Sequence, residues 1–172
     1  MEPLVDKAAH GDRNAFIKLI EPRKEQIYKT AFVQLSNEQD AMDAVQETIL
    51  KAFERIHTLR NGHYFYTWLI RILLNECHNI QRRNKKVVFI DSRKIEDALD
   101  KKCMDSYPAE YEDMLKNLGE IHRTVIDLRY NQDLSISQIA EVLDIPEGTV
   151  KSRLNKAIKK LRVEIDGKEE AL

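Results

Sequence analysis

Residues 134–162 read LSISQIAEVLDIPEGTVKSRLNKAIKKLR, and this stretch decides the fold of the last third of the chain. Ser135, followed three residues later by Gln138, forms a capping-box pattern that predicts the start of a short helix. Residues 144–145 predict a turn. Pro146 suits the first position of a second, longer helix, where a missing N–H costs nothing. Two helices joined by so tight a turn predict a helix-turn-helix.

The second helix of this motif, expected over residues 146–163, is strongly basic. Its polar faces carry six cations against one anion, Glu147, although the whole chain of 172 residues has a formal net charge of −1. Its first turns can hydrogen-bond base edges and phosphates, as a helix that enters the major groove by its N-terminal end requires. A merely solvated basic helix is the alternative, but it would not need the capped helix and turn before it. We therefore expect duplex DNA to be contacted by Thr149, Lys151, Ser152 and Asn155.

Helical periodicity extends over most of the remaining chain. Helices are predicted over residues 2–20 with a break at Gly11-Asp12, over 24–35, over 39–59 and over 67–84. The chain contains only five Gly and four Pro, and this scarcity of turn residues favours long helices over a turn-rich β fold. The sequence therefore predicts an all-α protein.

Residues 86–109 break this pattern, because their few apolar residues cluster locally and their charges alternate in sign. We expect a flexible linker there, with at most a short helix. The periodicity resumes at Tyr111. The predicted architecture is two small helical domains, residues 1–85 and 110–172, joined by this linker, with the helix-turn-helix in the second domain.

The predicted helix over residues 39–59 has an acidic face. At about 100° per residue, Asp40, Asp43 and Glu47 lie opposite the apolar arc, and Leu50 is isolated among them. An acidic face with one exposed apolar residue fits a docking surface for a basic partner helix. An ordinary solvated face with a stray leucine fits the same pattern, so the residues alone leave both interpretations open.

The predicted helix over residues 67–84 combines aromatic, amide and basic side chains. Its buried side is expected to hold Leu69, Leu73, Cys77 and Ile80. The opposite side carries Arg71, Asn75, Asn79 and Arg82, with Trp68 at their head, Tyr64-Phe65-Tyr66 just before and a basic tail to Lys86. Single-stranded nucleic acid needs this combination, since rings stack on bases for about 1–3 kcal/mol each and cations follow the backbone. The alternative is that the aromatic residues belong to the core, and we expect at least Phe65 to do so.

Other function classes find little support in the sequence. It contains no nucleophile–base pair, no phosphate-binding glycine loop and no cluster with metal-ligand spacing. We therefore expect a protein that is not an enzyme and has no cofactor, metal or small-molecule substrate. Cys77 and Cys103 do not form a CxxC pair and suit a reducing compartment. Neither a signal peptide nor a membrane-spanning apolar run is visible, which predicts a cytoplasmic protein.

Three segments resemble the signature segments of extracytoplasmic-function (group IV) bacterial sigma factors. They are DAMDAVQET at residues 40–48, TWLIRI at 67–72 and GTVKSRL at 148–154. The resemblance extends from about Gly11 to Arg162, and the segments occur in the family's order and spacing. It implies an alternative sigma factor, a dissociable subunit that directs core RNA polymerase to specific promoters and opens the DNA there.

The resemblance also implies roles for the faces described above. The β′ clamp helices of core polymerase would be bound by Asp40, Asp43, Gln46, Glu47 and Leu50. The loop before the helix and the helix itself would recognise and melt the −10 element, and the loop would hold one flipped base. The residues implied are Arg60, Asn61, His63, Tyr64, Tyr66, Trp68, Arg71, Asn75, Asn79, Arg82 and Arg83. The second domain would contact the polymerase β flap and read the −35 element as duplex. Base or phosphate contacts there are expected from Lys151, Ser152, Asn155 and Lys156, and a backbone or structural contact from Arg153.

Regulation is a further implication of the resemblance. Such proteins are held inactive by an anti-sigma factor, often membrane-anchored, which buries the polymerase-binding faces and can hold the sigma factor at the inner face of the membrane. The linker would lie in the RNA-exit or active-site channel of the polymerase.

Two other interpretations compete with this one. A stand-alone regulator with a C-terminal helix-turn-helix and an N-terminal sensory domain explains residues 134–162. It leaves the acidic helix and the aromatic stretch before Trp68 unexplained. An enzyme explains still less, because no catalytic arrangement is visible.

Overall fold

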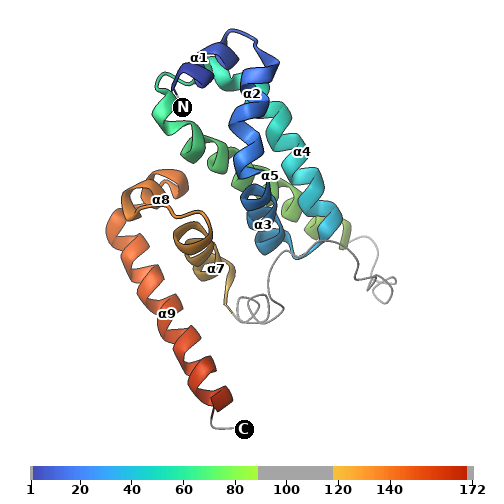
Figure 1. Cartoon of the computed structure of the whole chain (residues 1–172). Helices are drawn as coiled ribbons and strands as arrows, with labels where there is room; N and C mark the ends of the chain where they lie inside the picture. The colour runs from blue at the N-terminus through green and yellow to red at the C-terminus, as the bar shows by residue number, and fades with distance from the viewer. Residues whose placement is uncertain (1, 89–117, 170–172) are drawn as a thin grey trace.

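The computed structural model describes residues 2–88 and 118–169, and all of its regular elements over these residues are helices (Figure 1). We call residues 2–88 the N-terminal module and residues 118–169 the C-terminal module. The first contains α1 (Glu2–Ala9), α2 (Arg13–Ile20), η1 (Glu21–Arg23), α3 (Lys24–Leu35), α4 (Glu38–Arg55), η2 (Ile56–Thr58), η3 (Gly62–Tyr64) and α5 (Phe65–Val88). The second contains α7 (Glu120–Ile126), the π-helical turn η4 (Asp127–Asn131), α8 (Ile136–Leu143) and α9 (Glu147–Glu169). The prediction of an all-α fold is confirmed.

Side-chain caps explain where several helices of the N-terminal module begin. Asp12 accepts hydrogen bonds from the backbone N–H groups of Asn14 (2.9 Å) and Ala15 (3.1 Å) and so starts α2. Asn37 accepts from the N–H of Asp40 at 2.9 Å and starts α4. Each cap satisfies a donor that the first turn of a helix leaves without an intrahelical partner.

The capping box of the helix-turn-helix is present as predicted. The backbone N–H of Ser135 donates to Gln138 Oε1 at 2.9 Å, and the N–H of Gln138 donates to Ser135 Oγ at 3.2 Å. Helix α8 then ends at Asp144, whose φ of 53° lies in the left-handed region that a C-terminal cap requires.

Several helix boundaries differ from the sequence prediction, among them those of α9 and α5. Helix α9 begins at Glu147 rather than Pro146, because the Pro146 carbonyl already accepts from the N–H groups of Thr149 (2.9 Å) and Val150 (3.2 Å), as the residue before a helix does. Helix α5 begins two residues early because η3 leads directly into it, and it continues through residues 86–88, where no Gly or Pro interrupts it. The rest of the predicted linker, from residue 89, lies outside the described residues.

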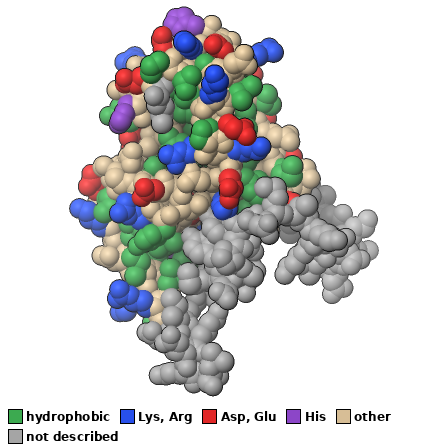
Figure 2. Space-filling model, in the orientation of Figure 1, with side chains coloured by type: hydrophobic (Ala, Val, Ile, Leu, Met, Phe, Trp, Pro, Cys, Tyr) green, Lys and Arg blue, Asp and Glu red, His purple; other side chains and the backbone are tan. Residues whose placement is uncertain are grey.

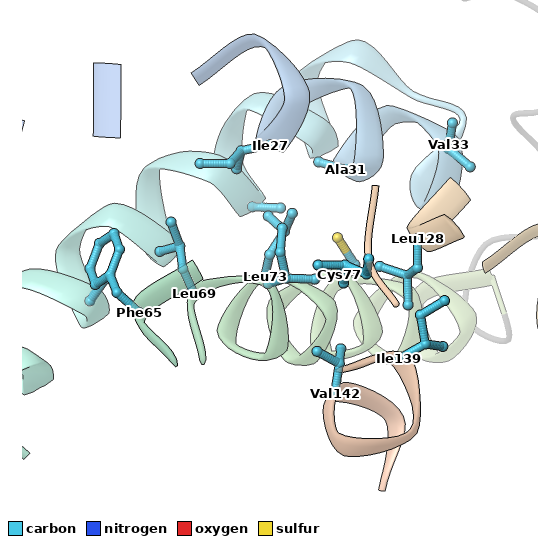
Figure 3. Close-up of a cluster of buried hydrophobic side chains, with 14 of the residues drawn as sticks. Ile27, Ala31, Val33, Phe65, Leu69, Leu73, Cys77, Leu128, Ile139 and Val142 are labelled. Carbon is cyan, nitrogen blue, oxygen red and sulfur yellow. The ribbon is translucent and has the colours of Figure 1, made fainter. Parts of the chain in front are cut away.

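Helix α5 lies at the centre of the fold. Figure 3 shows Ile27 and Ala31 of α3 on one side of it and Val142 of α8 on the other, with Leu128 of η4 and Ile139 of α8 in the same cluster. All five side chains are buried, as are Leu69, Leu73 and Cys77 of α5 itself. Each large aliphatic side chain buried in this way contributes about 1.5–3 kcal/mol. One continuous apolar cluster therefore spans both modules.

The remaining helices support this centre. Helix α4 packs on α3 and α5, and the rings of Phe16 on α2 and Phe53 on α4 meet edge to face at 5.2 Å. Helix α9 packs on α7 and α8 and extends away from the other helices toward the C-terminus (Figure 1). None of the described helices combines the length and apolar character needed to cross a membrane.

Candidate functional site

The acidic face of α4 is open to solvent. Asp43, Gln46 and Glu47 are exposed, Asp40 is half-buried, and the side chain of Leu50 is 60% exposed. The predicted docking residues therefore share one accessible face. The opposite face is buried through small residues, Ala41, Ala44, Thr48 and Ala52, which let α4 approach its neighbours closely.

An ion pair that sequence reasoning missed fixes α4 to α5. Lys51 Nζ lies 2.7 Å from Glu76 Oε2 and 3.1 Å from Glu47 Oε1. The Glu76 side chain is only 8% exposed. Its hydrogen bond with Lys51, reinforced by Glu47, raises the pKa of the Lys51 ammonium group despite partial desolvation. One signal for this pair was visible in the sequence: an acidic residue at position 76 lies inside the apolar arc of α5.

A second contact joins the acidic face to α5. Asn84 Nδ2 donates a hydrogen bond to Asp40 Oδ2 at 2.8 Å, so the N-terminal end of α4 is attached near the C-terminal end of α5. Together with the Lys51–Glu76 pair, this bond fixes the position of the acidic face relative to the polar face of α5.

The loop before α5 presents a second set of predicted residues. Arg60, Asn61, His63 and Tyr64 are all exposed. The Asn61 side chain also accepts from the His63 N–H at 2.9 Å and so caps η3. The loop is held from below by α1: a Cβ on Gly62 would lie 3.1 Å from Val5 Cβ.

The three consecutive aromatic residues have different environments. Phe65 is buried, as predicted, and its ring centroid lies 6.0 Å from that of Trp68. Tyr64 is exposed, and Tyr66 is half-buried with the Arg23 guanidinium 4.6 Å above its ring. Burial raises the pKa of Tyr66 to about 12, so its hydroxyl stays protonated and able to donate.

The polar face of α5 is only partly free. Arg71, Asn75, Arg82 and Arg83 are exposed and Asn79 is half-buried, so the predicted residues lie along one side of the helix. The guanidinium of Arg71, however, donates to the backbone carbonyl of Glu141 on α8. The hydroxyl of Tyr66 donates to Gln132 Oε1 just after η4. Neither contact was expected from the sequence.

The second helix of the helix-turn-helix presents its basic face to solvent. Lys151, Ser152, Asn155 and Lys156 are exposed, whereas Thr149 and Arg153 are half-buried. Val150, Leu154 and Ala157 are buried, as the predicted apolar face requires. The positive charges of α9 also act on α7. There, burial and the nearby Lys160, Lys156 and Arg153 lower the pKa of His122.

A groove of about 380 Å³ lies between the two modules. Helices α3, α5, α7, α8 and α9 and the α8–α9 turn line it, through Gln34, Leu74, Cys77, His78, Gln81, Glu120, Ile121, Thr124, Leu143, Ile145 and Arg153. Burial raises the pKa of the Cys77 thiol to about 12, so this side chain stays a neutral, unreactive group. The described residues contain no cluster of three or more His, Cys, Asp or Glu side chains that could hold a metal ion.

Acidic and basic side chains are concentrated on different helices. On the face shown in Figure 2, acidic and basic side chains are intermixed, in keeping with the near-zero net charge. The predicted docking residues on α4 are mainly acidic and those on α9 mainly basic, so each face locally favours partners of opposite charge.

Known sequences and structures resemble this chain over most of its length. Residues 19–87 match the family model of sigma-70 region 2, and residues 114–163 match that of sigma-70 region 4. The RNA polymerase sigma factor SigV of Bacillus subtilis is 33% identical over 150 residues, which cover 87% of this chain and 90% of SigV. The ECF RNA polymerase sigma-E factor of Haemophilus influenzae is 32% identical, covering 91% and 90% of the two chains.

Two solved structures share the fold. CnrH, in complex with the cytosolic domain of CnrY, gives a TM-score of 0.75 at 24% identity, with 96% of this chain and 97% of that chain covered. The sigma factor RpoE of Bartonella quintana, in complex with the anti-sigma factor NepR, gives 0.72 at 23% identity, covering 87% and 94%. With its regions 2 and 4 in order and these relatives matched over nearly their full length, the chain belongs to the extracytoplasmic-function RNA polymerase sigma factors.

Proposed function

We propose that this sigma factor binds core RNA polymerase through α4, melts the −10 element on α5 and reads the −35 element with α9. The observation that carries the proposal is the coexistence of three faces of different chemistry in one chain: an exposed acidic face on α4, a partly free aromatic and polar face on α5, and an exposed basic face on α9. The N-terminal module is then region 2 and the C-terminal module is region 4, and of the linker predicted over residues 86–109 the first three residues belong to α5.

The acidic face suits a basic helical partner, which the β′ clamp helices of the polymerase provide. Asp40, Asp43 and Glu47 attract it, and Gln46 offers hydrogen bonds. Leu50, which is 60% exposed, supplies the apolar anchor. Exposed charges of this kind contribute mainly orientation and association rate, whereas the apolar anchor contributes affinity.

The loop and α5 suit a separated strand. Tyr64 and Trp68 offer ring faces for stacking, and Asn75 and Asn79 offer amides for base edges. A base flipped out of the duplex costs a few kcal/mol, and a pocket formed by the loop residues Arg60, Asn61, His63 and Tyr64 offsets that cost. Arg82 and Arg83 follow the phosphates.

The basic face of α9 suits the major groove of the −35 duplex. Lys151, Ser152, Asn155 and Lys156 are exposed there and contact bases or phosphates, while the half-buried Thr149 and Arg153 contact the backbone or support the helix. Region 4 also contacts the β flap of the polymerase.

An anti-sigma factor is the proposed regulator. CnrH and RpoE, which share this fold, were solved as complexes, and the RpoE partner is an anti-sigma factor. For this chain we infer an anti-sigma factor that covers the α4 face. A membrane-anchored anti-sigma factor would hold the chain at the inner face of the membrane. The chain works in the cytoplasm, where the polymerase is, and supplies no catalytic group or cofactor of its own.

Transcription with purified components tests the proposal. Core polymerase is incubated with and without the chain on genomic DNA from the source organism, and the 5′ ends of the transcripts are sequenced. We expect start sites that require the chain and share −10 and −35 elements. If the chain shifts duplex DNA by itself but creates no start sites and does not bind core, it is a stand-alone regulator and the proposal fails.

A matched pair of variants tests the polymerase face. Leu50→Ala removes the exposed apolar anchor of α4, and Ile17→Ala removes an equally exposed one (56%) from α2, outside the proposed faces. We expect L50A to weaken binding to core polymerase about tenfold or more, as loss of an interface anchor does, and I17A to leave it unchanged. Equal affinities for both variants would contradict the assignment of α4.

A further inference from the structure

The first helix of the chain lies against the loop that leads into α5. Helix α1 contacts η2 and η3, the two short turns on either side of residues 59–61. Its Val5 is 4% exposed and its Ala8 is 1% exposed. Helix α1 is therefore packed into the N-terminal module through small apolar side chains, next to the loop proposed to hold the flipped base.

The loop has no apolar side chain of its own to fix its position. Between Leu59 and Tyr64 it reads RNGH. Two hydrogen bonds close it on itself: the His63 N–H donates to Asn61 Oδ1 at 2.9 Å, and the Tyr64 N–H donates to the Asn61 carbonyl at 3.1 Å. Such bonds set the shape of the loop but do not tie it to a neighbouring helix, so its position depends on packing contacts.

Gly62 makes a packing contact of this kind with α1. A positive φ occurs at Gly11 and not at Gly62, so no left-handed conformation requires a glycine here. An added Cβ would lie 3.1 Å from Val5 Cβ and 3.4 Å from both Val5 Cγ1 and Glu2 Cα. The missing side chain therefore serves close approach, and the loop backbone rests directly on the N-terminal half of α1.

We propose that α1 takes part in −10 recognition, with Val5 as a positioning residue that holds the loop where its exposed side chains can enclose the flipped base. This inference rests on the proposed −10 role of the loop. A binding site works only while its groups are held within about 0.5 Å of the productive geometry. Without the Val5 methyl groups a gap would open under Gly62, and the loop would sample positions in which its side chains no longer meet around the base.

Four variants separate the position of the loop from the stability of the module. Val5→Ala removes the two methyl groups under Gly62. Val5→Thr keeps the shape of the side chain but buries a hydroxyl group, which is also destabilising. Val33→Ala makes the same truncation in another buried valine, on α3, at the far end of the apolar cluster from Phe65 (Figure 3). Gly62→Ala alters the contact from the other side, because Val5 and the loop would have to move apart by a few tenths of an ångström.

Binding to single-stranded −10 DNA by the holoenzyme gives the outcome. Each variant is assembled with core polymerase, and fluorescence anisotropy measures its affinity for a −10 strand from a promoter mapped in the transcription experiment. Every position of the strand is replaced in turn by an abasic site, and the flipped base is the one whose loss weakens wild-type binding most. We expect that loss to cost the wild type, V5T and V33A about tenfold, as loss of a stacked or hydrogen-bonded base does.

For V5A and G62A the same loss should cost only about threefold or less, because a misplaced loop already lacks most of that contact. Urea denaturation should show V5A and V5T both less stable than the wild type, so stability alone would not explain a difference between them. Affinity for core polymerase should be the same for all four variants.

The outcomes separate this inference from the proposed function. An unchanged effect of the abasic site in V5A or in G62A would overturn the role of α1, even if the chain directs transcription. An equal fall in V5T or V33A would also overturn it, because general loosening of the module would then explain the loss. If no single position matters to the wild-type holoenzyme, the loop holds no flipped base, and the proposed −10 role of the loop fails together with this inference.

Discussion

At the scale of single residues, the Lys51–Glu76 pair is a contact that the sequence alone does not predict. The polar side of α5 could be predicted because Arg71, Asn75 and Arg82 follow the helical period. Glu76 could not be predicted as buried, because its partner lies 25 residues away and a single acidic residue in an apolar arc carries no information about what neutralises it. The same applies to Tyr66, whose contacts are with Arg23 and Gln132.

Lys51→Met should therefore destabilise the N-terminal module. The variant leaves the Glu76 carboxylate buried without its partner, which costs about 2 kcal/mol of the free energy of unfolding. Lys24→Met is the control. Lys24 Nζ lies 3.9 Å from Glu21 Oε1, and both side chains are 67% exposed. Exposed pairs of this kind contribute under about 1 kcal/mol. Urea denaturation of both variants measures the difference, and equal losses would contradict the role of Glu76.

The same pair predicts a dependence on alkaline pH. The folded-state pKa of Lys51 lies above its ordinary value of 10.5, so folding favours the protonated form. Its contribution to stability is fully present below about pH 10 and is lost as pH rises through the folded-state pKa. The stability difference between wild type and K51M should accordingly be constant from pH 7 to about 10 and shrink above it. A difference that grows with pH would contradict the assignment.

At the scale of secondary-structure elements, local signals predicted most of the fold. Helix α3 spans residues 24–35 as expected, and the Ser135–Gln138 capping box forms as its residues indicate. These features depend on neighbours within a few residues, and that is why the sequence determines them directly. Helix α5 begins two residues before its predicted start, because η3, a turn without apolar periodicity, continues directly into the helix.

Asp144→Gly should stabilise the helix-turn-helix. Asp144 ends α8 with a φ of 53°, a conformation that costs an L-residue about 1 kcal/mol and glycine almost nothing. We expect a gain of about 0.5–1 kcal/mol in the free energy of unfolding of region 4. Glu141→Gly, inside the same helix, should instead lose about 1 kcal/mol. Hydrogen exchange of the α8 amides measures both, and a loss in D144G would refute the argument.

Recognition by α9 should show in the salt dependence of promoter binding. Lys151→Ala removes an exposed cation from the proposed phosphate contacts. The slope of log K against log salt should decrease in magnitude by about 1 for holoenzyme on promoter DNA. Lys18→Ala, an exposed lysine on α2, is the control and should leave the slope unchanged. The docking face would be wrong if the two variants behaved alike.

At the scale of the whole molecule, two domains could be predicted but not their contact. The bonds that join them pair residues about a hundred positions apart, such as Thr30 with Asp127. They involve isolated polar side chains that no periodicity singles out. Apolar faces on α5 and α8 could each be predicted as buried, but nothing in the sequence says that they are buried partly against one another.

Melting is a property of the assembled holoenzyme, and Asn75→Ala tests it there. Asn75 is exposed on α5, so its replacement removes the proposed contact to a base without disturbing the core. We expect transcription from duplex promoters to fall about tenfold, as loss of a discriminating base contact does, and to fall much less on templates already unpaired at −10. Asn14→Ala on α2 is the control. Equal losses of N75A on both templates would argue against a melting role.

The close contact between Gly62 and Val5 limits which substitutions the loop before α5 can accept. Gly62 lies on an exposed loop, where sequence drift is ordinarily free. A Cβ added to Gly62 would nevertheless lie 3.1 Å from the Cβ of Val5. A Cβ added to Gly119 or Gly148 would meet no atom within 4 Å. A saturation library should therefore accept alanine at 119 and 148 more readily than at 62, where Val5 would have to shift by a few tenths of an ångström. The loop proposed to contact −10 DNA would then be constrained in its evolution by a contact beneath it, from the first helix of the chain.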